Sequence, residues 1–494
     1  MNTTVNVSAA TSRAVRPNLV LAICCLSLLM VSMDATIVNV ALPSIRRDLD
    51  ASISGLQWVI DAYTLVVASL LMFAGSMADR FGRRRIFQAG MSLFMLGSLL
   101  CSLAPDIHGL IAFRVIQALG ATMLNPVAMS IIANTFTEPK ARARAIGVWG
   151  AVVGISMALG PLIGGALTQS IGWRSIFWIN LPIGAAAILL AALYIPESKA
   201  PRARRIDPLG QLLVFTALAS LTYAVIEGPR MHWASVTIVG LFATSLAAVF
   251  AILLYEPQRI DPLLDLRFFR SVPFSSAAAI AVCSFSAFGG FLFLNALYLQ
   301  EVRGLSSFRT GLCTLPLALA TMVCSPLSGR LVGAYGTRPS LLIAGVAMVL
   351  SAFILTHLSA DSELSTLMLA YVIFGIGFGS VNAPITNTAV SGMPKAQAGL
   401  AAAVTSTSRQ VGASLGVAIA GTIVGTQAAT GASFPEATHA FWWFMLGAGL
   451  MVFVLGLVSS SGWARASSQR AAHLLEEPFP AEAGKRVPVV GLAE

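Results

Sequence analysis

The sequence predicts an all-α membrane protein with fourteen transmembrane helices, arranged as two six-helix repeats with two helices inserted between them. Three observations predict this fold class. The chain of 494 residues is 56% hydrophobic and only 11% charged, whereas a soluble domain carries about 25% charged residues. Fourteen segments are apolar enough to cross a bilayer, and the second half of the chain repeats motifs of the first.

The composition excludes several classes of protein. So few charged residues cannot cover a water-soluble surface of this size, which disfavours a soluble enzyme, a disordered chain and a secreted scaffold. The net charge of +10 would indicate nucleic acid in a soluble protein, but here the basic residues follow membrane topology. The six cysteines lie in apolar runs without the spacing of a metal site, so neither a metal nor a disulfide framework is predicted.

The predicted helices follow from the length of the apolar runs. A helix needs about 20 apolar residues to cross roughly 30 Å of hydrocarbon. Gly, Pro, Ser and Thr interrupt several runs, as is typical where membrane helices pack on one another. The predicted spans are 18–40, 54–76, 86–104, 107–134, 145–170, 175–195, 208–228, 234–255, 273–299, 308–333, 340–358, 364–392, 397–425 and 439–460.

The distribution of Lys and Arg predicts the orientation. With the N-terminus inside, the cytoplasmic segments hold 23 of the 31 basic residues, the opposite side holds 6, and 2 lie within helices. By the positive-inside rule, both termini are therefore cytoplasmic. Residues 1–17 form a cytoplasmic N-terminal tail, and residues 461–494 form a cytoplasmic C-terminal tail that we expect to lack regular structure from Arg465 onward.

Internal repetition divides the chain. At an offset of about 256 residues, Asn125-Pro126 corresponds to Asn382-Ala-Pro384, and Gly160 and Gly165 correspond to Gly416 and Gly421. The repeats predict an N-terminal six-helix bundle at 18–196 and a C-terminal one at 273–460, with two inserted helices at 208–255. Parallel repeats of this kind are a transporter architecture, with the substrate site between the halves.

Four sequence blocks resemble those of the major facilitator superfamily, and within it the fourteen-helix drug:proton antiporters of the EmrB/QacA type. They are Met33-Asp-Ala-Thr-Ile-Val-Asn-Val-Ala-Leu-Pro43, Gly75-Ser-Met-Ala-Asp-Arg-Phe-Gly-Arg-Arg-Arg85, Arg114-Val-Ile-Gln-Ala-Leu-Gly120 and Gly154-(x)5-Gly160-Pro161-Leu-Ile-Gly164-Gly165. The resemblance spans residues 18–460 and implies the major facilitator fold, with export driven by the proton gradient and no bound cofactor.

Three ionisable residues are predicted to couple transport to protons. Asp34 lies roughly 24 Å along an outward-running helix, and Asp61 and Arg114 each lie 7 residues from the outer start of their helices. At similar depth such residues face a cavity and pair with one another. A carboxylate near a guanidinium can exchange its proton when the cavity changes sides, although a static salt bridge between the helices is the alternative.

Two glycine-containing blocks have a conformational interpretation. In the cytoplasmic loop, the resemblance implies a latch that favours the outward-open state, beside the plain role of a topology anchor; its residues are Gly75, Asp79, Arg80, Gly82, Arg83 and Arg84. In the span 145–170, a smooth glycine face and a proline permit a kink and close packing against the other half. The resemblance makes this an antiporter signature, carried by Gly154, Gly160, Pro161, Gly164 and Gly165.

Further polar residues are candidates for the substrate cavity. Arg409 lies 12 residues into its span, and the second half offers no acidic partner at that depth. Glu227 at the end of the span 208–228 is interpreted as a solvated helix end. The other candidates, for which packing is an equal alternative, are Asn39, Trp58, Tyr63, Asn125, Asn295, Asn382 and Asn387.

The sequence therefore predicts a proton-coupled exporter of amphipathic, often cationic drugs, antiseptics or antibiotics in the cytoplasmic membrane. Its partners are the small-molecule substrate, protons and membrane lipids; no nucleic acid is expected and no accessory efflux partner is indicated. A dedicated exporter of one antibiotic or metabolite is the alternative, and a membrane sensor is disfavoured. No nucleotide-binding Gly-x-x-x-x-Gly-Lys-[Ser/Thr] motif occurs, which excludes an ATP-driven pump, and no enzyme motif is found.

Overall fold

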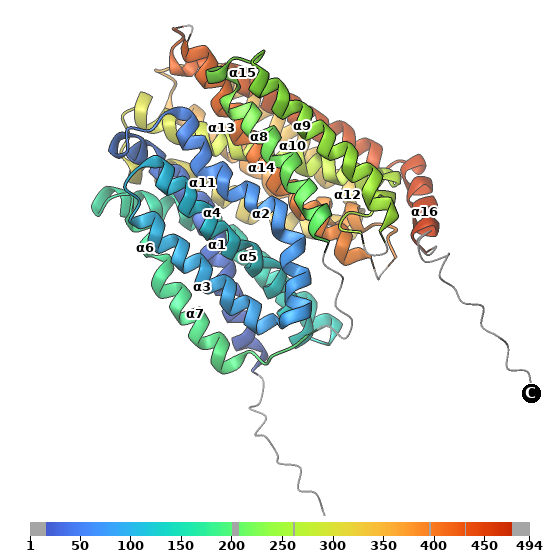
Figure 1. Cartoon of the computed structure of the whole chain (residues 1–494). Coiled ribbons are helices and arrows are strands. Elements are labelled where there is room, and N and C mark those ends of the chain that lie inside the picture. Colours follow the sequence, from blue (N-terminus) through green and yellow to red (C-terminus); the bar gives the residue numbers. More distant parts are fainter. Residues whose placement is uncertain (1–15, 200–206, 260–261, 395–396, 430, 477–494) are drawn as a thin grey trace, which may run out of the picture.

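The computed structural model describes residues 16–199, 207–259, 262–394, 397–429 and 431–476, and within these ranges every regular element is helical (Figure 1). Most of the predicted N-terminal tail, and the C-terminal tail beyond residue 476, lie outside the described residues. Thirteen helices in the described ranges are long and apolar enough to cross a membrane.

The first half of the chain forms one bundle. Its sixth predicted span divides at Ile179 into a short and a long helix. The helices are α1 (Pro17–Asp48), α2 (Ile53–Phe81), α3 (Arg83–Ser102), α4 (Ile107–Thr135), α5 (Pro139–Ser170), α6 (Ser175–Trp178) and α7 (Asn180–Tyr194).

The remaining helices form the inserted pair and the second bundle. The inserted helices are α8 (Pro208–Met231) and α9 (Val236–Tyr255), followed by short turns η1 (Glu256–Gln258) and η2 (Leu266–Arg270). The second bundle contains α10 (Val272–Leu297), the π-helical turn η3 (Tyr298–Val302), α11 (Ser307–Tyr335), α12 (Thr337–Leu355), α13 (Leu364–Val390), α14 (Ala398–Ala429) and α15 (Phe434–Ser459), and α16 (Gly462–Glu476) follows it.

Local sequence explains where many helices begin. Ser52, Asp106 and Ser235 each accept a hydrogen bond from a backbone N–H three residues later, which caps α2, α4 and α9. Several helices are longer than the predicted spans. Helix α1, for example, has 32 residues, which cover roughly 48 Å at 1.5 Å per residue. They therefore project beyond a hydrocarbon layer of about 30 Å.

Helix α14 corresponds to the predicted span 397–425, although it is not among the thirteen helices that are apolar enough to cross a membrane. Its centre carries the polar run Ser406-Thr-Ser-Arg-Gln410, which lowers its hydropathy. The chain leaves α13 at one end of the bundle and enters α15 at the other, so the helix between them has to cross. The predicted fourteen-helix architecture is therefore confirmed.

One expectation about the C-terminus is wrong. Residues 462–476 form α16 instead of an irregular tail. Arg267 donates to the carbonyl of Leu474, and Gln397 donates to the carbonyl of Leu475, so α16 is held against η2 and the start of α14. Leu475 is buried with Phe268 and Phe274 in a small apolar cluster, and this contact stabilises the helix.

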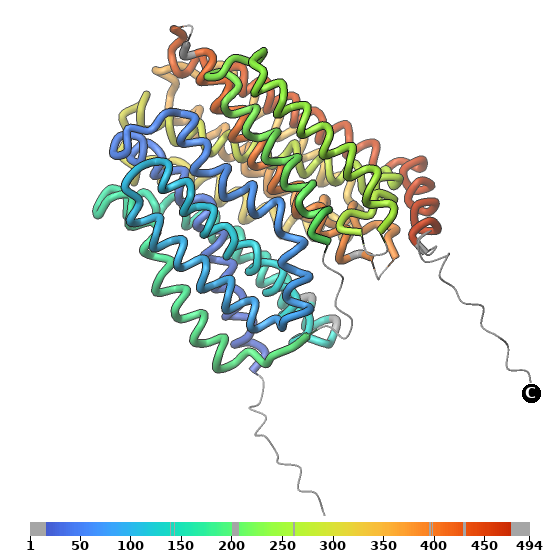
Figure 2. Tube along the Cα trace, in the orientation of Figure 1, coloured from blue at the N-terminus to red at the C-terminus, as the bar shows by residue number. Residues whose placement is uncertain are grey.

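The two halves form separate bundles that meet along two pairs of helices, α2 with α14 and α5 with α11 (Figure 2). The inserted helix α8 contacts both α2 and α14, and α9 lies along α8. We call the end that carries the start of α1 and the α2–α3 connection the basic end, because Arg80, Arg83, Arg84 and Arg85 lie there. The other end is the far end.

The bundles are joined at the far end. Arg46 at the end of α1 forms an ion pair of 2.7 Å with Glu301, and Gln57 of α2 donates to the carbonyl of Ala418 at 2.8 Å. The largest buried apolar cluster contains residues of both bundles, among them Val59 and Val417. The molecule is thus closed at the far end.

Helices α5 and α11 separate toward the basic end. A Cβ atom on Gly147 or Gly150 of α5 would meet no atom within 4 Å, and the same holds for Gly329 and Gly333 of α11. Nearer the far end, Gly165 of α5 packs on the main chain of α11. This combination, closed at one end and separated at the other, is one of the two arrangements that alternating access requires.

Candidate functional site

The centre of the first bundle holds a buried ion pair. Arg114 of α4 donates from Nη1 to Oδ2 of Asp34 on α1 at 2.6 Å. Asp34 is 0% and Arg114 1% exposed, so water contributes nothing to their solvation. Burying two charges in this way is costly unless their remaining donors and acceptors are also satisfied.

Neutral side chains satisfy the second carboxylate oxygen. Gln117 and Asn180 each donate to Oδ1 of Asp34, at 2.8 and 3.1 Å, and both also donate to the hydroxyl of Ser98. Three donors from α4 and α7 therefore surround the Asp34 carboxylate. Sequence reasoning missed Gln117, Asn180 and Ser98, although Gln117 lies three residues after Arg114 and hence on the same face of α4.

The guanidinium of Arg114 is fixed on its other sides as well. Its Nε donates to the carbonyl of Val59 at 3.1 Å, and its Nη1 also donates to Oε1 of Gln117 at 2.7 Å. Its Cζ lies 4.2 Å from the ring centroid of Tyr63, within the range of a cation–π interaction. Tyr63, predicted to line a substrate cavity, is instead 3% exposed inside the first bundle.

Asp61 lies at similar depth but does not join this pair. Its Oδ1 accepts from Thr64 at 3.4 Å, and the hydroxyl of Ser414 on α14 lies beside it. Asp61 is 0% exposed, and no basic side chain among the described residues pairs with it. It therefore faces the other bundle across the α2–α14 interface, whereas Asp34 faces its own.

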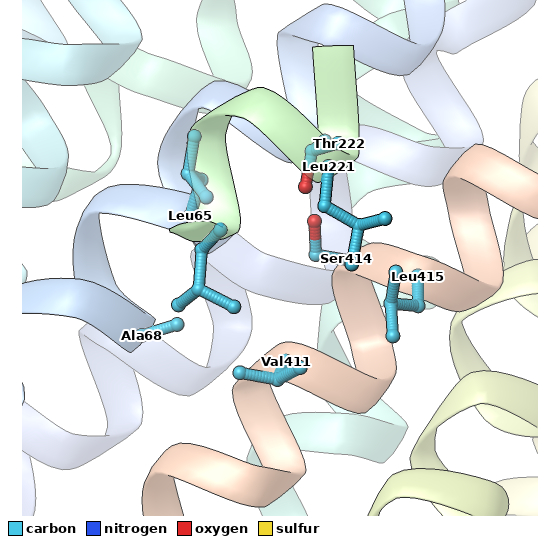
Figure 3. A pocket seen from close by; sticks show the side chains of 8 residues that line it. Leu65, Ala68, Leu221, Thr222, Val411, Ser414 and Leu415 are labelled. Atoms are coloured by element: carbon cyan, nitrogen blue, oxygen red, sulfur yellow. The ribbon is translucent and has the colours of Figure 1, made fainter. Parts of the chain in front are cut away.

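A small, mostly apolar pocket lies next to Asp61, between α2, α8 and α14. In Figure 3 the hydroxyl groups of Thr222 and Ser414 point toward each other across it. Ser414 thus borders both the carboxylate and the pocket. The lining residues are Leu65, Ala68, Leu218, Leu221, Thr222, Val411, Ser414 and Leu415.

The other predicted cavity residues do not form one cluster. Asn295 accepts from the hydroxyl of Tyr371 inside the second bundle, whereas Asn39 donates to its own helix at the carbonyl of Ala35. Asn125 is partly buried, with its Oδ1 unpartnered among the described residues. Asn382 and Asn387 lie on α13 in the basic half, where each donates to a carbonyl four residues earlier.

Glu227 corrects an expectation. It is 6% exposed and is not a solvated helix end. Its Oε1 accepts from the hydroxyl of Ser54 at 2.7 Å and from the indole of Trp58 at 3.0 Å, both on α2. Trp58, a predicted cavity residue, therefore ties the inserted helix α8 to the first bundle.

The α2–α3 loop is held by a residue that the sequence motif does not include. Glu197, after α7, accepts hydrogen bonds from the backbone N–H groups of Arg84 and Arg85 at 3.1 and 3.3 Å, which caps the start of α3. Gly82 turns the chain with φ +112°, and a Cβ there would lie 2.6 Å from the Glu197 carboxylate. Asp79 accepts from Arg83 of the same loop at 2.9 Å.

Replacing this cap is expected to weaken the first bundle. Glu197→Ala leaves two backbone N–H groups at the start of α3 without an acceptor, which should cost about 0.5–2 kcal/mol. Thermal unfolding of the purified protein in detergent should show a lower midpoint for Glu197→Ala and a smaller decrease for Glu197→Gln, which keeps an acceptor. An unchanged midpoint for Glu197→Ala would show that the cap contributes nothing.

The glycines of α5 contact two helices, α1 of the same bundle and α11 of the other bundle. A Cβ on Gly160 or Gly164 would collide with Thr36 and Ile37 of α1, within the same bundle. Gly165 packs against the main chain of α11 at Ser307. The expected contact with the other half is therefore only part of the role of these glycines.

The rest of the α5 motif continues the contact with α11. Gly311 of α11 packs on the main chain of Pro161, and Gly154 faces Met322 at an ordinary van der Waals distance. Helix α14 repeats this arrangement, because its Gly416 packs on α10 and its Gly421 packs on Gln57 of α2. Each repeat thus contributes one glycine helix that contacts both bundles.

Arg409 of α14 finds neutral partners. Its Nη2 donates to Thr386 Oγ1 at 2.8 Å and to the carbonyl of Asn382 at 3.3 Å, and its Cζ lies 5.9 Å from the ring centroid of Phe285. None of the ion pairs among the described residues involves it. Nor does the described part of the chain contain a group of three His, Cys, Asp or Glu side chains that could hold a metal.

Comparisons with known proteins show which sequences this chain resembles. The sequence model of the Major Facilitator Superfamily matches residues 24–417. The multidrug resistance protein Stp of Mycobacterium tuberculosis is 40% identical over 400 residues, covering 81% of this chain and 74% of the relative. The tetracenomycin C resistance and export protein of Streptomyces glaucescens is 34% identical over 409 residues, covering 83% and 76%. The puromycin resistance protein pur8 of Streptomyces alboniger is 39% identical over 402 residues, covering 80% and 79%.

Proposed function

The chain belongs to the Major Facilitator Superfamily, a family of transporters and not of enzymes, and on this premise we propose that it exports amphipathic drugs or antibiotics in exchange for protons. The relatives named for drug and antibiotic resistance or export support the cargo class. The observation that carries the proposal is the buried pair of Asp34 and Arg114, because a proton taken up by Asp34 would break its ion pair with Arg114.

The packing offers a route from the proton to the opening of the molecule. Protonation of Asp34 removes its attraction to Arg114 and loosens α1 from α4. Two residues further along α1, Thr36 packs on Gly160 of α5, and Gly165 of α5 packs on α11. A shift of α1 therefore reaches the contact between the bundles. We assign the basic end to the cytoplasm by the positive-inside rule, so the structure corresponds to the inward-facing state.

The loop motif fits the same cycle. In this state Asp79 accepts a hydrogen bond from Arg83, and no ion pair among the described residues joins it to the second bundle. A latch that stabilises the outward-open state is expected to be released when the far end closes. We therefore propose that this loop acts as a latch of the outward-open state, in addition to its role as a topology anchor.

Drug susceptibility of a pump-deficient bacterial host tests the function. Cells that express the chain should tolerate several unrelated amphipathic compounds better than cells with an empty vector, and a protonophore should abolish the difference. Increased tolerance to one compound alone would indicate a dedicated exporter. The relatives that are named for a single antibiotic support this alternative. No shift for any compound would contradict export.

Asp61 is the carboxylate available to cationic cargo. No basic residue in the described part of the chain pairs with it, and an ionised carboxylate of low solvation attracts a divalent cation more strongly than a monovalent one. Asp61→Asn should therefore reduce resistance to divalent cationic drugs most, to monovalent ones less and to neutral ones least. Resistance across such a series measures this, and equal losses for all three would assign Asp61 to the proton cycle or the fold.

A further inference from the structure

The guanidinium of Arg409 has unused donors in the middle of the second bundle. Arg409 lies 11 residues after the start of α14, roughly 16 Å from the basic end of the helix. Its hydrogen-bond acceptors among the described residues are Thr386 and the carbonyl of Asn382, and both accept from Nη2. Its Nε is buried and has no partner in the described part of the chain. A guanidinium has five N–H donors, so those of Nε and Nη1 are left for a ligand.

The charges around Arg409 leave it without a counter-ion. Arg114, the other basic residue at mid-membrane depth, is paired with Asp34. Asp61 approaches α14 at Ser414, five residues beyond Arg409, which places it on a different face of that helix. An ionised side chain this deep is costly, and such residues mark the path of a substrate or ion.

The surroundings of Arg409 are both accessible and aromatic. Arg409 and Thr386 are partly exposed, and Asn387, near the basic end of α13, is exposed. Phe285, over which the guanidinium lies, packs edge-on against Phe378 at 5.1 Å between ring centroids, and Phe378 stacks on Phe288 at 4.1 Å. A cationic group thus borders an aromatic surface near the end where α5 and α11 separate.

We propose that Arg409 binds the acidic group of an amphipathic aromatic substrate, whose rings lie against Phe285 and its neighbours. This inference rests on the proposed export function and specifies the substrate class. A carboxylate or sulfonate supplies the acceptors that Nε and Nη1 lack, in a charge-assisted hydrogen bond that a neutral analogue cannot form. The chain therefore discriminates in favour of acids at this subsite, independently of Asp61.

A matched pair of fluorescent dyes tests the proposal. The anionic dye 8-anilino-1-naphthalenesulfonate and the neutral N-phenyl-1-naphthylamine share one aromatic scaffold and differ by the sulfonate. Binding is measured on the full chain in phosphatidylcholine nanodiscs, with empty nanodiscs subtracted. Arg409→Gln should weaken binding of the anionic dye roughly 10- to 100-fold, the range of a hydrogen bond to a charged group, and leave the neutral dye within about twofold.

Two further variants complete the experiment. Arg409→Lys keeps the charge but loses the planar fork, so it should bind the anionic dye with intermediate affinity. Arg144→Gln removes an exposed positive charge from the basic end of α5 and should change neither affinity. Size-exclusion chromatography of each variant shows that it is folded.

Three outcomes would overturn the proposal. They are an unchanged affinity of Arg409→Gln for the anionic dye, an equal loss for both dyes, and competition by phosphatidylglycerol in the nanodiscs that depends on Arg409, which would assign the site to a lipid headgroup. Uptake of both dyes into energised everted vesicles is measured in parallel. If the wild-type chain transports neither dye, the export proposal fails whatever the binding data show, because binding is measured without transport.

Discussion

Asp34→Asn is expected to abolish substrate-induced proton release from everted vesicles, a loss of at least about tenfold in the initial rate, while the protein remains in the membrane. The amide has nearly the volume of the carboxyl group but cannot cycle a proton. It also leaves Arg114, which is 1% exposed, without its counter-ion. Removing one partner of a buried ion pair typically costs about 3–5 kcal/mol.

The stability cost and the coupling defect can be separated. In Asp34→Asn with Arg114→Gln, no unpaired charge remains, so the unfolding midpoint should recover toward the wild-type value while proton release stays absent. Asp106→Asn is the matched control, since Asp106 is an exposed cap of α4 and Asn caps a helix equally well. Normal proton release by Asp34→Asn would show that Asp34 serves only as a structural ion pair.

Gly165→Ala is expected to shift the protein away from the state that is closed at the far end. A methyl group at Gly165 would collide with the main chain of α11 at Ser307, and a backbone cannot rotate away as a side chain can. Such overpacking costs about 1–3 kcal/mol. The penalty applies only while the bundles touch here, so it should change the ratio of the two states roughly 10- to 100-fold.

Cysteine labelling measures this shift. Val417 is 2% exposed at the contact of α14 with α2 near the far end, and Gln57 donates to its carbonyl. In a variant without native cysteines, Val417→Cys should react slowly with an impermeant reagent from the far side, and faster once Gly165→Ala is added. Gly150→Ala, where a Cβ meets nothing within 4 Å, should leave the rate unchanged. Equal rates in all three backgrounds would mean that α5 and α11 do not separate at Gly165.

The sequence could predict which ionisable residues of the site lie at the same depth in the membrane. Counting residues along helices of known direction places Asp34, Asp61 and Arg114 in one layer, and the structure finds Asp34 and Arg114 in contact. Depth says nothing about the direction in which a side chain points around the helix axis. For this reason Asp61, at the same depth, lies against Ser414 of the other bundle.

Polar partners outside the sequence motifs were the least predictable part of the site. Asn180, Ser98 and Glu197 carry no signal in a single sequence, because polar residues near helix ends are common and usually solvated. Glu227 shows that a residue interpreted as solvated can be buried by contacts with another helix. Its place before Gly228 and Pro229 is typical of a solvated end, yet contacts with Ser54 and Trp58 bury it.

The sequence alone was enough to predict an all-helical chain of many membrane spans, its internal repetition, and which ionisable residues lie deep in those spans. These properties depend on transfer of side chains from water to hydrocarbon, which acts on each segment separately. The folded structure was needed to show that Asp34 and Asp61 face different bundles, that Gly160 and Gly165 contact different helices, that residues 462–476 form a helix, and that the far end is closed. These depend on rotation about helix axes and on packing between segments distant in sequence, which local hydropathy does not encode.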